Sequence, residues 1–197
     1  MSNDLPELAA LPKMPPMDEK TQQMISQRNY IPTQTALSWD EYFMFQAMMA
    51  SFKSKDPSTK VGCVFVDENR HQITMGYNGF VAGIDEEKLP WGRDQQAPLE
   101  HQKYGYVVHA EANALLHGPR SLAGSSLYVT LFPCHECAKL VASSKCKEVI
   151  FLKDKYVGTQ SNIIAKKIFD LTGIHYRQLS LSHKLVDDLN LYFGGLL

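Results

Sequence analysis

The pattern of apolar and polar positions predicts regular structure from about residue 37 onward. Ser38 precedes Glu41 by three residues, and an apolar run from Tyr42 to Phe52 follows. This spacing is typical of a capping box, in which the two side chains satisfy the first backbone N–H groups of a helix. We therefore expect a helix from Trp39 to about Ser54.

The apolar runs that follow this helix are short and typical of strands. Residues 61–66 (VGCVFV) and 72–77 (QITMGY) favour strands, and the polar residues 67–70 between them predict a hairpin. Residues 78–105 show little periodicity and contain several glycines and prolines. A segment of this length without regular structure is usually functional or disordered.

The rest of the chain alternates between helical and extended patterns. We expect helices near 109–117, 134–144 and 162–171, and strands at 127–132, 148–152 and 174–177. A hairpin followed by alternating helices and strands indicates an α/β sandwich with helices on both faces of the sheet.

Three parts of the chain are distinguished by composition and pattern. Residues 1–36 are expected to form an N-terminal extension, because five prolines interrupt any long helix there. Residues 37–180 are expected to form the folded domain, and residues 181–197 a C-terminal helix and tail stopped by two glycines.

The overall charge excludes some classes of partner. The formal net charge is -1, from 20 basic and 21 acidic residues, which argues against a surface built for nucleic acid or anionic lipid. No apolar run approaches the roughly 18 residues that span a bilayer. The first 20 residues lack the basic and apolar regions of a secretory signal, so we expect a cytoplasmic protein with neither membrane nor nucleic-acid partners.

Two short motifs carry the candidate chemistry: residues 109–111 (HAE) and 133–137 (PCHEC), each at the start of a predicted helix. Two cysteines spaced in this way lie on one face of the helix, at the end where the helix dipole favours thiolates. One imidazole and two thiolates, from His109, Cys134 and Cys137, make a three-ligand zinc site. Its open fourth position is typical of catalytic rather than structural zinc.

Glu111 lies close enough to this site to reach a water on the metal without being a ligand. A positioned carboxylate that takes and returns protons contributes roughly 10²- to 10⁴-fold to a rate. The combination of His-x-Glu with Pro-Cys-x-x-Cys is the general signature of zinc deaminases. Two alternatives stay open: a thioredoxin-like redox pair, and a closed structural zinc site with a fourth ligand from His101, His117, His135 or Cys146.

Beyond these motifs, residues 39 to about 177 resemble the deoxycytidylate (dCMP) deaminase family, within the zinc-dependent cytidine/deoxycytidylate deaminase superfamily. The matching stretches are WDEYFM (39–44), SKDPSTKVG (54–62), GYNGF (76–80), LPW (89–91), YVVHAEANA (106–114), LFPCHECAK (131–139), EVIF (148–151) and DKY (154–156).

The resemblance implies a three-layer α/β/α cytidine-deaminase-like fold, with a central five-stranded mixed sheet and helices on both faces. It implies a hydrolase that converts dCMP to dUMP and ammonia and so supplies dUMP for thymidylate synthesis. Zinc-bound hydroxide would attack C4 of cytosine, with Glu111 as the proton shuttle. The family's features also imply Asn78 and Ala110 as substrate contacts, with Asn78 at the sugar.

The phosphate of such a substrate requires cationic or hydroxyl donors, because an unpaired dianion is costly to desolvate. Lys155 and Tyr156, on the loop after the strand at 148–152, are the candidates, and an ordinary solvated turn is the alternative for both.

The resemblance further implies a homo-oligomer, with a hexamer favoured, activated by dCTP with Mg²⁺ and inhibited by dTTP. Three departures from the family pattern fall around the implied effector region: Lys53 replaces a common arginine, residues 79–83 lack the usual proline, and Gly92 stands where a second arginine occurs. The implied effector residues are Lys53, Lys55, Asp56, Gly76, Asn78 and Gly79.

Other functions are compatible with the zinc motifs. A dual dCMP/dCTP deaminase differs only in a local phosphate pocket. A polynucleotide or tRNA deaminase needs a basic, aromatic-lined channel, which the near-neutral charge disfavours. A non-catalytic zinc-stabilised nucleotide-binding protein is disfavoured by the presence of Glu111.

Overall fold

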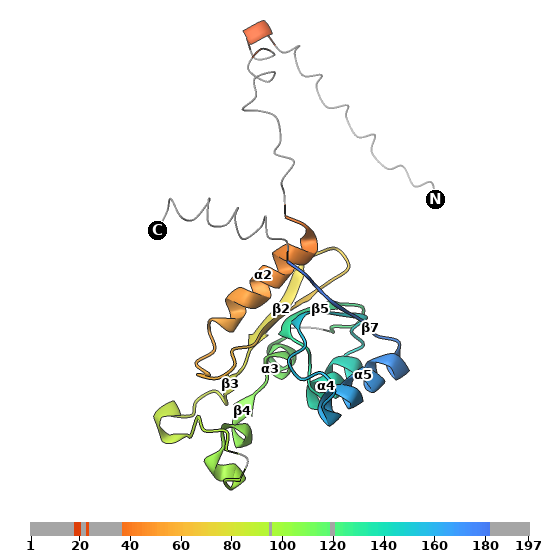
Figure 1. Cartoon of the computed structure of the whole chain (residues 1–197). Coiled ribbons are helices and arrows are strands. Elements are labelled where there is room, and N and C mark those ends of the chain that lie inside the picture. The colour runs from red at the N-terminus through yellow and green to blue at the C-terminus, as the bar shows by residue number, and fades with distance from the viewer. Residues whose placement is uncertain (1–17, 21–22, 24–36, 95, 119–120, 182–197) are drawn as a thin grey trace, which may run out of the picture. The chain divides into compact units, whose positions relative to one another are not determined.

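The computed structural model describes residues 18–20, 23, 37–94, 96–118 and 121–181 (Figure 1). Contacts between Cα atoms separate residues 1–36 from residues 37–197, and the following concerns the second unit. The predicted extension and C-terminal helix lie almost wholly outside the described residues and stay predictions. Among the residues that the structure describes, no helix is both long and apolar enough to cross a bilayer.

The first helix of this unit, α2 (Trp39–Ser51), begins with the predicted capping box. The Ser38 hydroxyl accepts a hydrogen bond from the Glu41 N–H at 3.2 Å, and the Glu41 carboxylate accepts one from the Ser38 N–H at 3.2 Å. The helix ends three residues earlier than predicted, because residues 52–54 continue as turns whose N–H groups bond three residues back.

The predicted hairpin is confirmed and forms one side of a five-stranded sheet. Strand β1 (Gly62–Val66) pairs antiparallel with β2 (Gln72–Tyr77) and with β5 (Ser126–Leu131). Strands β6 (Glu148–Lys153) and β7 (His175–Gln178) continue from β5 in parallel, so the order is β2-β1-β5-β6-β7. The sheet is therefore mixed, as predicted.

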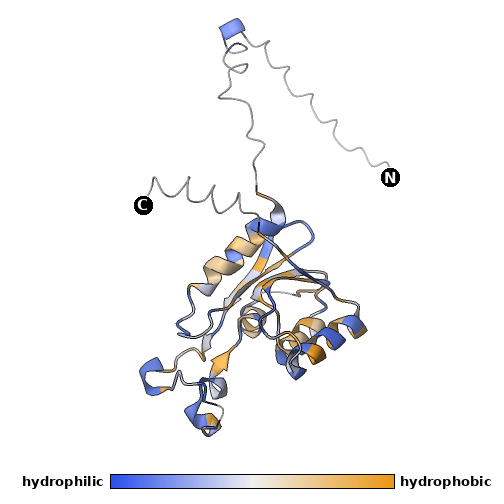
Figure 2. Cartoon of the chain, in the orientation of Figure 1, coloured by the Kyte–Doolittle hydropathy of each residue, from blue (hydrophilic) through white to orange (hydrophobic). Residues whose placement is uncertain are grey.

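Helices cover both faces of this sheet, which confirms the three-layer architecture (Figure 1). Along β1, Val64 packs with α2, whereas Cys63 and Phe65 pack with the helices of the other face. Those helices are α3 (Ala110–His117), α4 (His135–Ser143) and α5 (Gln160–Thr172). In Figure 2, α5 carries both hydrophilic and hydrophobic residues, as a helix with one buried side does.

The segment without periodicity contains structure that the sequence did not reveal. Strands β3 (Gly79–Phe80) and β4 (Val107–Val108) form a separate two-stranded sheet. Between them lie three 3₁₀ turns, η2 (Glu86–Lys88), η3 (Leu99–His101) and η4 (Lys103–Gly105). Each element has two or three residues, too few for a hydrophobic period to show.

Two glycines allow helices to pack directly on the hairpin backbone. A Cβ atom on Gly76 would lie 2.2 Å from the carbonyl oxygen of Ala110, in the first turn of α3. A Cβ atom on Gly62 would lie 2.1 Å from the carbonyl oxygen of Ala47 in α2. Gly76, implied above as an effector residue, thus has a packing role that fixes the start of α3.

We expect Gly76→Ala to destabilise the protein, because the added methyl group displaces α3 from β2. Overpacking of this kind costs about 1–3 kcal/mol, and contact with two backbone atoms of α3, in Ala110 and Ala114, places this change at the upper end. Urea unfolding measures the loss. Gly79→Ala is the matched control, because no atom lies within 4 Å of its built Cβ, and its free energy of unfolding should change by less than about 0.5 kcal/mol. Equal stability of the two variants would contradict the packing role.

Candidate active site and metal centre

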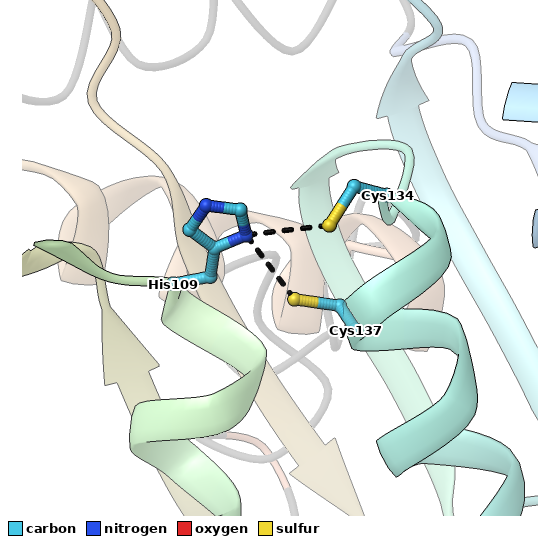
Figure 3. A group of neighbouring side chains, drawn as sticks. All are labelled: His109, Cys134 and Cys137. Atoms are coloured by element: carbon cyan, nitrogen blue, oxygen red, sulfur yellow. Dashed lines mark hydrogen bonds between the residues drawn. The ribbon is translucent and has the colours of Figure 1, made fainter. Parts of the chain in front are cut away.

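The three predicted metal ligands come together at the starts of two helices. His109 is the N-cap of α3 and Cys134 is the N-cap of α4, and neither side chain makes a capping hydrogen bond. The two side chains instead face each other, together with Cys137 from the first turn of α4 (Figure 3). His109 Nδ1 lies 3.4 Å from Cys134 Sγ and 3.3 Å from Cys137 Sγ.

These distances fit a zinc ion. Zn–S bonds of about 2.3 Å and Zn–N bonds of about 2.0–2.1 Å at tetrahedral angles place nitrogen and sulfur roughly 3.6 Å apart. One imidazole and two sulfur ligands also form a donor set that zinc prefers. The ligand atoms of all three residues lie within 4.8 Å of one another. The arrangement therefore suits a metal held by three protein ligands.

The alternative of a closed structural site is disfavoured by the surroundings. Among the residues that the structure describes, no fourth His, Cys, Asp or Glu joins this group. Cys146 is buried elsewhere and its thiol donates to the backbone oxygens of Ser125 and Glu148. Both ring nitrogens of His135 have other partners, Ser161 and Glu136. The fourth position is thus left for water or substrate.

The pKa values of the two cysteine thiols are shifted in opposite directions. A hydrogen bond from the Cys137 thiol, with a further one from His109, lowers the pKa of Cys134 to about 4. The neighbouring Cys134 thiolate and burial raise the pKa of Cys137 above its usual range. The pKa of His109 is raised, chiefly by its hydrogen bond to Cys134. Because zinc binds both sulfurs as thiolates, binding of the metal would release the proton of Cys137.

Glu111 lies in the first turn of α3 and is only 4% exposed. Burial raises its pKa, whereas the charge of His109 and the hydrogen bond from Cys137 act in the opposite direction. A carboxyl group that holds a proton more readily than an exposed one is suited to proton transfer near neutral pH. The geometry therefore brings a candidate proton shuttle beside the three ligands.

A pocket of about 380 Å³ opens over this centre, within the range of small-molecule sites. His109, Glu111 and Cys134 form part of its lining, and the rest comes from segments far apart in the chain. Four of the predicted substrate or effector residues also line it, and they are Asp56, Asn78, Ala110 and Tyr156.

The remaining predicted residues lie either at the rim of this pocket or outside it. Lys155 lies beside Tyr156, with Nζ 3.5 Å from the Thr59 hydroxyl. Lys55 pairs with Glu86 on the surface at 3.2 Å. Lys53 and Gly79, like Lys55 and Gly76, are not part of the lining. The structure thus places Asp56 and Asn78 at the pocket, and the implied effector role of the six residues stays a prediction.

Sequence reasoning missed several lining residues. Arg93 and Lys103 come from the long segment before α3, where no periodicity marked them. Ser161 and Asn162 come from the start of α5, which begins two residues earlier than predicted. The Thr159 hydroxyl caps this helix by accepting from the Asn162 N–H, and a search for capping residues would have found this boundary.

Comparisons with known proteins agree with this site. Residues 37–153 match the family described as the cytidine and deoxycytidylate deaminase zinc-binding region. The chain is 40% identical to mouse deoxycytidylate deaminase over 78% of its own length and 87% of the relative's. It is 41% identical to the human deoxycytidylate deaminase over 72% of its length and 80% of the relative's.

The fold also matches solved structures. The dCMP deaminase of cyanophage S-TIM5, crystallised with dCMP and dUMP, superimposes with a TM-score of 0.59 at 23% sequence identity. The match covers 74% of this chain and 100% of that one. The predicted cytidine-deaminase-like fold is thereby confirmed.

We expect Cys134 to react as a thiolate in the metal-free protein. Its thiolate fraction falls only as the pH drops through about 4. Alkylation by iodoacetamide in the presence of a chelator should therefore change little between about pH 7 and pH 5, whereas an ordinary thiol with a pKa of about 8.5 slows roughly tenfold per pH unit. Mass spectrometry locates the modified residue. Cys63 and Cys146, both buried with raised pKa values, are internal controls. Zinc should protect Cys134, and a steep pH dependence would contradict the assignment.

Proposed function

Because the chain belongs to the cytidine and deoxycytidylate deaminase family, we propose that it hydrolyses dCMP to dUMP and ammonia. The chain is a deaminase, and the choice of dCMP is supported by relatives of that activity that align over most of both chains. The observation that carries the proposal is the convergence of the three ligands His109, Cys134 and Cys137 at a pocket that the buried Glu111 also lines.

The three ligands and Glu111 divide the chemistry between them. Zinc held by these ligands would lower the pKa of a water from about 15.7 toward about 7 and so supply a nucleophile at neutral pH. His109 contributes Nδ1, the nitrogen that faces both sulfurs. Ala110 and Glu111 follow directly in the first turn of α3, so the same helix start places a ligand and the proton shuttle.

Glu111 moves the protons that hydrolysis requires. Its carboxylate accepts a proton from the attacking water and donates it to N3 of cytosine as C4 becomes tetrahedral. A second proton passes through the same carboxylate to the departing amino group. Burial favours the protonated state between these transfers, because it penalises the charge of the carboxylate.

We expect Glu111→Gln to lose at least about 100-fold in kcat while retaining zinc, because the amide cannot transfer protons. Steady-state deamination of dCMP and atomic absorption measure the two quantities. Glu136→Gln is the matched control: this glutamate lies between the two cysteines of the motif but is exposed and paired with Lys139. Wild-type turnover in Glu111→Gln would exclude the shuttle, and loss of zinc would assign Glu111 to the metal site instead.

The rim of the pocket supports a nucleotide rather than a nucleoside substrate. Arg93 is exposed and lines the pocket, and Tyr156 also contributes to the lining. Lys155 Nζ lies 5.5 Å from the centre of the Tyr156 ring, beside Thr59. We propose that these cationic and hydroxyl groups receive the 5′-phosphate, since such groups offset the cost of desolvating a dianion.

We expect kcat/KM to be highest for dCMP in a panel that includes CMP, cytidine, dCTP and a short single-stranded oligodeoxynucleotide. Lys155→Met should raise KM for dCMP by roughly 3- to 10-fold with little effect on cytidine, because it removes a charge-assisted contact to phosphate. Equal kcat/KM for cytidine and dCMP would contradict phosphate recognition. A higher value for dCTP would favour the dual activity.

Several finer points rest on the family resemblance and stay predictions. They are activation by dCTP with Mg²⁺, inhibition by dTTP, a hexameric assembly and a role in supplying dUMP for thymidylate synthesis. The same substrate panel, repeated with each effector, tests the first two. The cytoplasmic location, expected from the amino-terminal sequence, also stays a prediction.

A further inference from the structure

A buried ion pair forms part of the pocket wall. Lys103 Nζ lies 2.5 Å from Asp56 Oδ2, and the two side chains are only 6% and 2% exposed. The other ion pairs of the described residues all have a more exposed partner. A buried pair is costly to desolvate and contributes little to stability by itself. Its place beside the active site therefore points to a specific function.

The carboxylate of Asp56 accepts four hydrogen bonds. The backbone N–H groups of Ser58 and Thr59 donate to Oδ1 at 2.8 and 3.1 Å. Lys103 Nζ and Asn78 Nδ2 both donate to Oδ2, Asn78 at 3.2 Å. Burial alone would raise the pKa of Asp56, but the bond from Lys103 and the two backbone bonds lower it. Asp56 is therefore an anion that only accepts hydrogen bonds.

The side chain of Asn78 is oriented by this carboxylate and by the backbone. Its two N–H donors are used by Asp56 Oδ2 and by the carbonyl oxygen of Thr59, the latter at 3.0 Å. Its Oδ1 accepts from the Val61 N–H at 2.8 Å. Since a backbone N–H only donates and a carbonyl only accepts, these partners fix which end of the amide is oxygen. Asn78 has one lone pair on Oδ1 left to offer, so it can only accept from a ligand.

Only one group of dCMP is a hydrogen-bond donor that is free to bind the acceptor Oδ1 of Asn78. The phosphate oxygens and base carbonyl of dCMP are acceptors, and its amino group is the one that reacts at C4. The 3′-hydroxyl is the remaining donor. We propose that Lys103 is a positioning residue for sugar recognition: acting through Asp56, it keeps Asn78 an acceptor toward the 3′-hydroxyl of the nucleotide. This inference rests on the proposed function.

Loss of the Lys103 charge would change the hydrogen-bonding groups that this wall presents to a ligand. An unpaired buried carboxylate takes up a proton, and a protonated carboxyl becomes a donor. Since Oδ1 accepts from the Ser58 and Thr59 N–H groups, the proton goes to Oδ2, which then accepts only weakly from Asn78. The Asn78 N–H released there presents a donor to the ligand beside the Oδ1 acceptor. The backbone contact of Lys103, from its N–H to the Gly92 carbonyl oxygen at 2.8 Å, does not depend on the side chain. Lys103→Met therefore tests the side chain alone.

The test compares dCMP with its 2′,3′-dideoxy analogue, using the full-length zinc-loaded protein. Wild type should prefer dCMP. In Lys103→Met, kcat/KM for dCMP should fall roughly 10-fold, mainly through KM, while the value for the analogue stays within about 2-fold. The ratio of kcat/KM for dCMP to that for the analogue, which measures the preference for a 3′-hydroxyl, should therefore fall close to 1. Lys88→Met, which removes an exposed lysine of the same segment, is the control and should keep the preference.

A second variant keeps the test decisive if Lys103→Met folds poorly. When Asp56→Asn is combined with Lys103→Met, no buried charge is left unpaired, so stability should recover. The side-chain amide introduced at position 56 still accepts through its oxygen from the N–H groups of Ser58 and Thr59. Its NH₂ group is thereby turned toward Asn78, so the preference should stay lost.

Three results would decide against these assignments. An equal loss for both substrates in either folded, zinc-loaded variant would show a merely structural pair and overturn the inference. An unchanged preference would overturn it as well. A wild-type protein that deaminates neither substrate would instead overturn the proposed function on which the inference rests.

Discussion

His109 and Cys134 occupy the N-cap positions of α3 and α4, and the approach of their side chains fixes the rest of the site. Both residues have extended backbone, with ψ of 157° and 169°, so their side chains leave the helix axis and meet. Glu111 and Cys137 then follow within the first turn of each helix. Two helix N-termini thus face one small volume, where their dipoles favour thiolates and a carboxylate. A zinc ion held there would add positive charge beside the Cys134 thiolate and favour loss of the proton from Cys137.

The parts of this arrangement that are local in the chain could be predicted from the sequence. The capping box of α2, the short apolar run of β1 and the His-x-Glu and Cys-x-x-Cys spacings each lie within a few residues, so the pattern and the structure have the same cause. Both ligand-bearing helices begin where the motifs predicted, because the motif residues are themselves the caps.

The pocket wall could not be predicted in the same way. Lys103 and Asp56 are 47 residues apart, and nothing local to either residue indicates the other. In the sequence, Asp56 is an implied effector residue, and Lys103 is one of two lysines in the irregular segment 78–105. Their pairing depends on how the segment between β3 and β4 returns to the pocket, and those strands are too short to leave a pattern. Long-range tertiary contacts, not local propensity, decide this part of the site.

The charged groups at the pocket differ in their exposure and in their partners. Beside the candidate metal ligands, the acidic groups are Cys134 and Glu111, and under the proposed function Glu111 is the one that acts on the reacting atoms. In the wall, Asp56 and Lys103 cancel, so this surface can discriminate only through the direction of its hydrogen bonds. At the rim, Arg93 and Lys155 are exposed and keep their attraction for an anion, screened by solvent. Under the proposed function, each part of the nucleotide therefore meets a different kind of interaction: proton transfer at the base, donor and acceptor polarity at the sugar, and charge at the phosphate. Substitutions at the rim would then change KM for anionic substrates without altering the proton chemistry of Glu111, because the groups belong to separate segments of the chain.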